Sequence, residues 1–175
     1  MSAMKRVILM RHAKSSWSDP GLENHDRPLS KRGRKSAPVM AKWLESEGPL
    51  PDRVLCSSSR RTRETLARMR KAVPALPEPE LREALYEATP EAILRQLRNL
   101  SRDCESALVI GHEPGMSSAL RMLAPGATAP ELHRAYAHYP TAAVAVLEAD
   151  IADWGEIGAG KARFTAFAVP RELIG

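Results

Sequence analysis

Val7-Ile8-Leu9-Met10-Arg11-His12-Ala13-Lys14 is the stretch that decides the fold, because an apolar run leads directly into an arginine and a histidine. A short apolar run with β-branched side chains is typical of a buried strand. The polar residues that follow it stand at the carboxyl end of that strand. In open α/β sheets, ligands bind in the crevice beyond the strand carboxyl ends. We therefore expect Arg11 and His12 to face a ligand site.

Two further apolar runs end in the same way. Ala107–Ile110 leads into Gly111-His112-Glu113-Pro114, and Val54–Cys56 leads into the serine- and arginine-rich segment Ser57–Thr65. A lone histidine after a strand is usually a hydrogen-bonded loop residue rather than a catalyst. Histidine, arginine and serine at the ends of several strands instead favour a site for an anion such as phosphate.

Length and composition bound the organisation of the chain. It has 175 residues, of which 43% are hydrophobic. A chain of this length is the size of a single domain with one core. We therefore expect one domain over residues 1–175. Twenty-six Lys and Arg against 21 Asp and Glu give a net charge of +5 and a pI near 9.5, which favours anionic partners.

Several other classes of protein are disfavoured. The basic clusters Lys31–Lys35 and Arg68–Lys71 fall in expected helices without an RNA-stacking or zinc-finger pattern, so we expect no nucleic-acid partner. Cys56 and Cys104 form neither a disulfide framework nor a metal-ligand spacing, which predicts the reducing cytoplasm and no metal. No secretory or membrane-spanning segment is evident. We expect a cytoplasmic monomer that does not bind membranes.

Strand-like and helix-like segments alternate along the chain, a pattern typical of a layered α/β fold. After a polar loop over residues 15–27, the sequence predicts the following elements: a helix capped by Ser30 and running through Leu44, a helix over about Arg60–Lys71, a Pro-rich connector over Pro74–Pro79, a helix capped by Thr89 and running to Leu100, a helix over about Met116–Leu123, and strands over Thr141–Glu148 and Ala162–Val169.

The residues at the strand ends suit phosphoryl transfer. The transferred group carries charge on its equatorial oxygens, and the planar guanidinium groups of Arg11 and Arg61 match that geometry. A neutral imidazole attacks phosphorus and divides hydrolysis into two easier steps. A second histidine holds the oxygens best in its charged form, which a bound dianion favours by raising its pKa. This chemistry requires neither a metal nor another cofactor.

The same residues carry a resemblance to a known family. Arg11-His12-Ala13 resembles the Arg-His-Gly signature of the histidine phosphatase superfamily, also called the phosphoglycerate mutase-like superfamily, although Ala13 replaces the usual glycine. Gly111–Pro114 is similar to its second-histidine motif, and Ser57–Thr65 to the segment that holds its second phosphate-binding arginine. Arg11–Trp17 followed by Asp26–Gly33 resembles the SixA-type branch, whose named members are phosphohistidine phosphatases. The resemblance implies a three-layer α/β/α domain with a mostly parallel central sheet.

The resemblance also implies roles for particular residues. His12 is expected to be the phosphorylated nucleophile, and Arg11, Arg61 and His112 are expected to bind the phosphate. The spacing of the Ser57–Thr65 motif selects Arg61 over the neighbouring arginines.

The proton donor is less well defined. Leu81–Tyr86 resembles the segment in which the mutase-type members place their acid, so Glu83 is the first candidate. Glu113 and Glu87 are alternatives. SixA-type enzymes often lack an obvious donor, because the leaving nitrogen of a phosphoramidate is basic and readily protonated.

The loop after the first strand could line the rim of the site. Lys14 and Trp17 follow the nucleophile closely enough to lie there, and the sequence does not decide whether either contacts the substrate. Arg27 either adds to the anion site or holds the loop through a carboxylate such as Asp19 or Asp26.

A cysteine-based phosphatase is a rival mechanism. However, the sixth residue after Cys56 is Thr62, so the spacing from Cys56 to an arginine does not fit the Cys-x5-Arg loop.

We therefore predict a metal-independent phosphatase that hydrolyses a phosphomonoester or a protein phosphohistidine through phospho-His12. Its partner would be a phosphorylated protein or a small phosphorylated metabolite. The alternatives are a non-catalytic module that binds phosphate, phosphoproteins or RNA, and a phosphomutase of the same superfamily.

Overall fold

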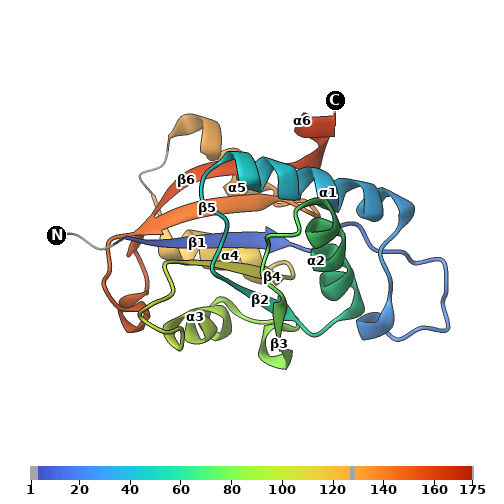
Figure 1. The fold of residues 1–175 in the computed structure, drawn as a ribbon, viewed down its shortest axis with the longest axis horizontal. Coiled ribbons are helices and arrows are strands. Elements are labelled where there is room, and N and C mark those ends of the chain that lie inside the picture. Colours follow the sequence, from blue (N-terminus) through green and yellow to red (C-terminus); the bar gives the residue numbers. More distant parts are fainter. Residues whose placement is uncertain (1–3, 127–128, 175) are drawn as a thin grey trace.

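The computed structural model describes residues 4–126 and 129–174. Within them, strands and helices alternate as the sequence predicts (Figure 1). The strands and longer helices are β1 (Lys5–Arg11), α1 (Lys31–Ser46), β2 (Arg53–Ser57), α2 (Arg60–Ala72), β3 (Pro79–Arg82), α3 (Pro90–Arg98), β4 (Ser106–Gly111), α4 (Gly115–Leu123), β5 (Val144–Ala149) and β6 (Ala162–Ala168). Two short helices, α5 (Arg134–Ala137) and α6 (Pro170–Ile174), flank the last two strands.

The strands form one sheet in the order β3-β2-β4-β1-β5-β6. β1 pairs with β4, and β2 pairs with β4 and β3, all in parallel. β5 pairs antiparallel with both β1 and β6. The expectation of a mostly parallel central sheet is confirmed.

Helices cover both faces of this sheet, which gives three layers (Figure 1). α1 and α2 bury their apolar sides against one face, where Met40 and Met69 share a core with Ile8 of β1. α3 and α4 pack on the other face, where Leu97 and Leu120 share a second core with strand residues. The continuous apolar runs of β1 and β4 follow from this arrangement, because a strand covered on both faces buries every side chain.

The predicted helix starts are confirmed at α1 and α3. The Ser30 hydroxyl accepts a hydrogen bond from the Gly33 amide, and the Thr89 hydroxyl accepts one from the Ala92 amide. Strand β5 begins at Val144 rather than at Thr141, because the chain turns there before it enters the sheet. Strand β3, which the sequence did not predict, begins at Pro79, the last residue of the predicted connector.

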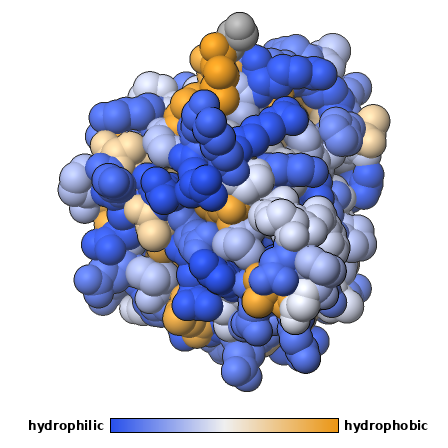
Figure 2. Space-filling view, turned by 90° about the vertical axis from the view of Figure 1, so that its right-hand side faces the viewer, coloured by the Kyte–Doolittle hydropathy of each residue, from blue (hydrophilic) through white to orange (hydrophobic). Residues whose placement is uncertain are grey.

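The register of the sheet brings three strand ends to one edge. Arg11 at the end of β1 lies opposite Gly111 at the end of β4, and Cys56 near the end of β2 lies opposite Ile110. The residues that follow these strands therefore meet beyond the same edge. Figure 2 shows this side of the molecule, which is mainly hydrophilic, with apolar surface gathered at the top of the view.

Gly33 fixes how the loop after β1 packs on the start of α1. Ser30 donates to the Lys14 carbonyl from both its amide and its hydroxyl, at 2.8 and 3.1 Å. A Cβ atom on Gly33 would lie 2.1 Å from the same carbonyl oxygen. Only glycine therefore lets the helix approach this backbone so closely.

Gly33→Ala is expected to lower the free energy of unfolding by about 1–3 kcal/mol, because the new methyl group must displace backbone rather than a flexible side chain. Gly126→Ala is the matched control, since a Cβ at that position would have no described atom beyond its chain neighbours within 4 Å. Urea unfolding checks the prediction. Equal stability of the two variants would contradict the close approach at Gly33.

Candidate active site

His12 lies directly after β1 and is only 7% exposed. Its Nδ1 atom is 2.7 Å from the Ala13 carbonyl oxygen. Because a carbonyl only accepts hydrogen bonds, Nδ1 must carry the proton. The other ring nitrogen, Nε2, then has a free lone pair, toward which Arg61 Nε donates at 3.3 Å. The fold thus presents the Nε2 of His12 as a potential nucleophile.

His112 follows β4, and its hydrogen bonds fix its protonation in the opposite way to that of His12, with the proton on Nε2 and the lone pair on Nδ1. Its Nδ1 is 3.3 Å from Arg61 Nη2, which can only donate, so the proton lies on Nε2. This Nε2–H donates to the Ser57 hydroxyl at 2.8 Å. The two imidazole rings are 5.3 Å apart between centroids. Both rings therefore direct an unprotonated nitrogen toward Arg61.

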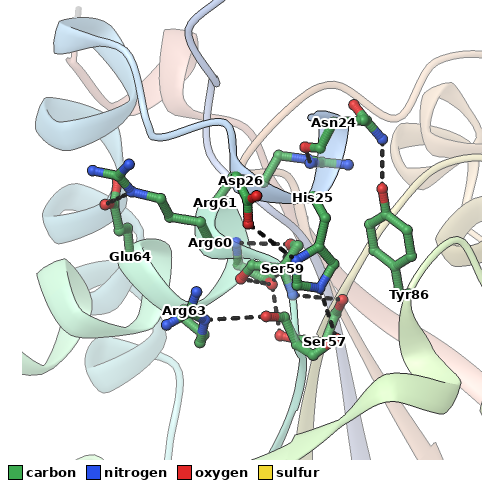
Figure 3. Close-up of polar contacts among 12 residues, drawn as sticks. Asn24, His25, Asp26, Ser57, Ser59, Arg60, Arg61, Arg63, Glu64 and Tyr86 are labelled. Carbon is green, nitrogen blue, oxygen red and sulfur yellow. Dashed lines mark hydrogen bonds and ion pairs between the residues drawn. The ribbon is translucent and has the colours of Figure 1, made fainter. Parts of the chain in front are cut away.

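Arg61 joins these two histidines from the first turn of α2. It is only 3% exposed, and its Nη1 donates to the Asn24 carbonyl at 2.7 Å. Ser59 caps the helix through the Thr62 amide, which fixes the turn that carries Arg61. The neighbouring Arg60 instead points to Glu64, to which its Nε donates at 2.8 Å (Figure 3).

Arg11 completes the cluster at the end of β1. Its Nη1 donates to the Tyr139 carbonyl at 3.0 Å, whereas its buried Nε has no hydrogen-bond partner among the described residues. An unpaired buried donor is unfavourable in the empty protein. The structure thus brings together the expected quartet of Arg11, His12, Arg61 and His112.

A cavity of about 480 Å³ opens over these side chains. We call it the histidine cavity. It is lined by Arg11, His12, Lys14, Ser15, Trp17, Asn24, Arg27, Arg61, Glu87, His112, Glu113, Pro114 and Thr141. Cations outnumber carboxylates on its walls, so it favours an anionic ligand.

Burial keeps both histidines neutral in this cavity. It is the main reason why the pKa of His12 falls to about 3, with Arg61 and Arg11 lowering it further. Burial also lowers the pKa of His112 to about 3, together with the nearby His12 and Arg61. A neutral imidazole is the form of histidine that can attack phosphorus. The charged His112 expected from the sequence would require a bound dianion.

These pKa values predict acid sensitivity. Between about pH 6.5 and pH 3 the unfolded chain binds more protons than the folded one, so stability falls as the pH falls through this window. Each histidine contributes a slope of at most about 1.4 kcal/mol per pH unit. Urea unfolding from pH 7 to pH 4.5 should show a steeper loss for the natural protein than for His12→Asn/His112→Asn. Equal slopes would contradict neutral burial.

Arg27 is a cavity residue whose partners the sequence did not reveal. Its Nη1 donates to the Ser15 hydroxyl at 2.7 Å, its Nε donates to Asn24 Oδ1 at 3.1 Å, and its guanidinium lies 3.4 Å from the centroid of the Trp17 ring. It is only 6% exposed. Of the two alternatives for Arg27, the one in which a carboxylate such as Asp19 or Asp26 holds it is wrong. Neutral polar groups hold it, and no carboxylate of the described residues pairs with its charge.

Asn24, His25 and Tyr86 form a polar and aromatic wall beside the histidines (Figure 3). Asn24 Nδ2 lies 2.6 Å from the Tyr86 hydroxyl. The Tyr86 ring meets the His112 ring edge-on at 5.2 Å and the His25 ring at 4.9 Å. No strand-end or motif spacing in the sequence pointed to this wall, because it joins segments about 60 residues apart.

The three candidate proton donors differ in their position relative to the histidine cavity and in their hydrogen-bond partners. Glu83 is exposed and does not line the histidine cavity, so its choice as first candidate is not supported by its position. Glu113 lines the cavity, but its carboxylate accepts from the Ser117 amide and hydroxyl at 2.6 and 2.7 Å. Glu87 lines the cavity, and its carboxylate accepts a hydrogen bond from Asn24 at 2.9 Å.

Two segments at the cavity have an unusual backbone conformation, with a positive φ at a residue other than glycine. Glu87 has φ of +49° and Ala142, next to the cavity residue Thr141, has φ of +63°. Residues other than glycine rarely adopt this left-handed conformation, and such strain clusters at functional sites.

Cys56 is fully buried, and burial raises the pKa of its thiol to about 12. It does not line the histidine cavity. The structure therefore agrees with the sequence in giving the thiol no role as nucleophile. Across residues 4–126 and 129–174, there is no cluster of three or more metal-binding side chains, and no helix is long and apolar enough to cross a membrane.

Comparisons with known proteins place this site in a family. The model of the histidine phosphatase superfamily (branch 1) matches residues 7–93. The uncharacterized protein Rv1276c of Mycobacterium tuberculosis is 37% identical over 164 residues, covering 93% of this chain and 100% of the relative.

Two solved structures extend the match to the whole fold. The putative phosphohistidine phosphatase SixA from Nakamurella multipartitia superposes with a TM-score of 0.81 and 27% identity over 97% of this chain and 98% of its own. The protein histidine phosphatase SixA complexed with tungstate gives a TM-score of 0.78 and 25% identity over 96% and 99% of the two chains. The chain belongs to the histidine phosphatase superfamily, in its SixA-type branch.

Proposed function

We propose that this protein is a phosphatase that hydrolyses a phosphomonoester or a protein phosphohistidine through a covalent intermediate on His12. The observation that carries the proposal is the fixed tautomer of His12. Its Nδ1–H is held by the Ala13 carbonyl, and its Nε2 lone pair lies beside Arg61 in a cavity rich in cations. A module that only binds phosphate needs the cations but not an oriented, neutral nucleophile.

In the first step, Nε2 of His12 attacks phosphorus, and the bond from phosphorus to the leaving oxygen or nitrogen breaks with its electron pair. The leaving group then takes a proton. In the second step, water attacks the phosphorus of phospho-His12, the P–N bond breaks, and inorganic phosphate leaves. The imidazole returns to its neutral form for the next cycle.

The guanidinium groups stabilise the charge that develops on the phosphoryl oxygens. Arg61 and Arg11 lie beside the nucleophile, and Arg27 contributes a third cation to the same cavity. Because these groups are buried and already held by the protein, little reorganisation is needed during the reaction. The tungstate bound by one SixA relative is an oxyanion of similar shape to phosphate, which supports an anion site of this kind.

We assign proton donation to Glu87 in place of Glu83. Glu87→Gln is expected to reduce the hydrolysis of an alkyl phosphate about 10²-fold or more, because an alkoxide leaves poorly without a proton. Hydrolysis of 4-nitrophenyl phosphate should change little, since nitrophenolate leaves unassisted. Glu83→Gln is the matched control and should behave like the natural protein with both substrates. Equal losses with both substrates in Glu87→Gln would contradict this assignment.

The proposed function is tested by following ³¹P signals of a phosphohistidine protein domain and a panel of phosphomonoesters with the purified protein. We expect inorganic phosphate to form from at least one of them, with chelator present. A phosphorylated isomer of the substrate as the main product would instead indicate a mutase. Tight phosphate binding without any turnover would indicate a binding module.

If the protein binds RNA, its affinity for RNA should fall steeply with salt concentration, and His12→Ala should leave this dependence unchanged.

The cytoplasmic location and the monomeric state remain predictions. Fractionation and sedimentation would test them.

A further inference from the structure

A second, larger cavity adjoins the histidine cavity. It has a volume of about 1010 Å³ and lies between the start of α1, the chain after α5, and the segment from the end of β6 into α6. We call it the basic groove. Lys14 and Thr141 line both cavities, so the two spaces share a wall beside the nucleophile. A molecule with its phosphate in the histidine cavity would extend toward the groove.

The groove presents cations that the protein leaves unpaired. Three residues of α1 line it with exposed side chains that form no hydrogen bond or ion pair with the described residues: Lys31, Arg32 and Lys35. Arg171 of α6 also lines the groove, and its exposed side chain has no such partner within the described ranges either. Arg134 differs, because it pairs with Glu172. The groove therefore holds positive charge that the side chains of residues 4–126 and 129–174 do not neutralise.

The position of these cations on α1 is unfavourable in the empty protein. The first turn of α1 contains no acidic residue and instead carries Lys31 and Arg32. The amino end of a helix has partial positive charge and favours acidic side chains. Lysine and arginine at this end raise the potential further, and a bound anion would relieve the repulsion.

The floor of the groove is apolar. Phe167 and Val169, at the end of β6, are nearly buried, and Ile174 of α6 is 57% exposed. The apolar surface at the top of Figure 2 lies where the chain approaches its carboxyl end. A concave site with an apolar floor and a few charged groups is the form that small organic ligands occupy, and the volume matches such a ligand.

We infer that the basic groove binds the remainder of a small phosphorylated substrate that carries an apolar body and a second anionic group. The phosphate would lie on His12, the body on Phe167 and Ile174, and the second anion, a carboxylate or a phosphate, on Lys31 and Lys35. This inference rests on the proposed function for the position of the phosphate. It narrows the substrate class to small organic molecules that carry a phosphate and a second anionic group.

The test uses a series of ω-carboxyalkyl phosphates of increasing chain length, each paired with its methyl ester. The free acid and the ester differ only in the second anion. At one chain length we expect kcat/KM for the acid to exceed that for its ester by about tenfold or more. The length at the maximum measures the span between the two anion sites.

Lys31→Ala/Lys35→Ala should bring this acid-to-ester ratio close to one. Arg68→Ala/Lys71→Ala is the matched control, because it removes the same charge from exposed positions outside the groove and should keep the ratio of the natural protein. An unchanged ratio in the groove variant would overturn the inference. So would an acidic phosphopeptide that is hydrolysed far better than every small acid and loses its advantage in the groove variant.

A binding measurement separates this inference from the proposed function. The corresponding ω-carboxyalkyl phosphonates cannot be hydrolysed, and calorimetry gives their affinity without turnover. If the protein hydrolyses nothing but still binds the acid more tightly than the ester, through Lys31 and Lys35, the groove is supported and the proposed function fails. If acid and ester do not differ in either assay, the inference that the groove binds a second anionic group is overturned.

Discussion

Replacing His12 by alanine is expected to reduce kcat by about four to six orders of magnitude, the range seen when an enzyme loses its nucleophile. The imidazole of His12 is the group whose Nε2 lone pair lies next to Arg61 in the cavity, and its Nδ1–H is held by the Ala13 carbonyl. Alanine removes this nitrogen without introducing a charge. Phosphate release under saturating substrate measures the loss.

Two controls distinguish loss of the nucleophile from loss of the fold. Added imidazole should enter the space left in His12→Ala and restore part of the activity. Cys56→Ser should keep nearly full activity, because Cys56 is buried away from the cavity. Full activity in His12→Ala together with an inactive Cys56→Ser would transfer the nucleophilic role to the thiol.

Arg61→Ala is expected to lower kcat/KM about 10³-fold, because Arg61 reaches both histidines and supplies charge where the phosphoryl oxygens would lie. Its removal also takes away one cause of the lowered pKa of His12 and of His112. The pKa of both rings should therefore rise toward the ordinary value, although burial still holds it down. Steady-state kinetics and NMR titration of the histidines measure the two effects.

Arg60→Ala is the matched control for Arg61. The two residues are neighbours on α2, but Arg60 points to Glu64 and is exposed (Figure 3). Its loss should leave kcat/KM within a few-fold of the natural value. If Arg60→Ala and Arg61→Ala lose activity equally, the assignment of the second phosphate-binding arginine is wrong.

The central strands and the four-residue cluster could be predicted from the sequence because their signals are local. Val7–Met10 and Ala107–Ile110 are buried on both sides, so each reads as an unbroken apolar run. The parallel register then brings the residues after them together. His12 and His112 could thus be expected at one site before any contact was known.

The edge strand β3 carries no such signal. Pro79–Arg82 alternates between exposed and partly exposed residues, begins with proline and contains only one large apolar side chain, Leu81. Its pairing depends on β2, where Cys56 lies opposite Leu81. Because this strand forms through a neighbour rather than through its own pattern, the sequence analysis predicted no strand here and only a connector that ends at Pro79.

The remaining cavity residues depend on tertiary contacts. Arg27 reaches the cavity because Ser15 pairs with Leu29 and folds the loop back on itself. Glu87, rather than Glu83, lines the cavity, and its backbone has the left-handed φ of +49°. Neither feature follows from spacing along the chain, so the sequence could name Arg27 and Glu87 as candidates but not place them.

The most direct measurement is rapid quenching of the protein with a ³²P-labelled substrate, followed by mapping of the labelled peptide. The account predicts a label on His12 that is stable in alkali, is lost in acid as expected for a phosphoramidate, and is absent from His12→Ala. A label on Cys56 or on a serine, or turnover with no covalent label under any quench, would contradict it.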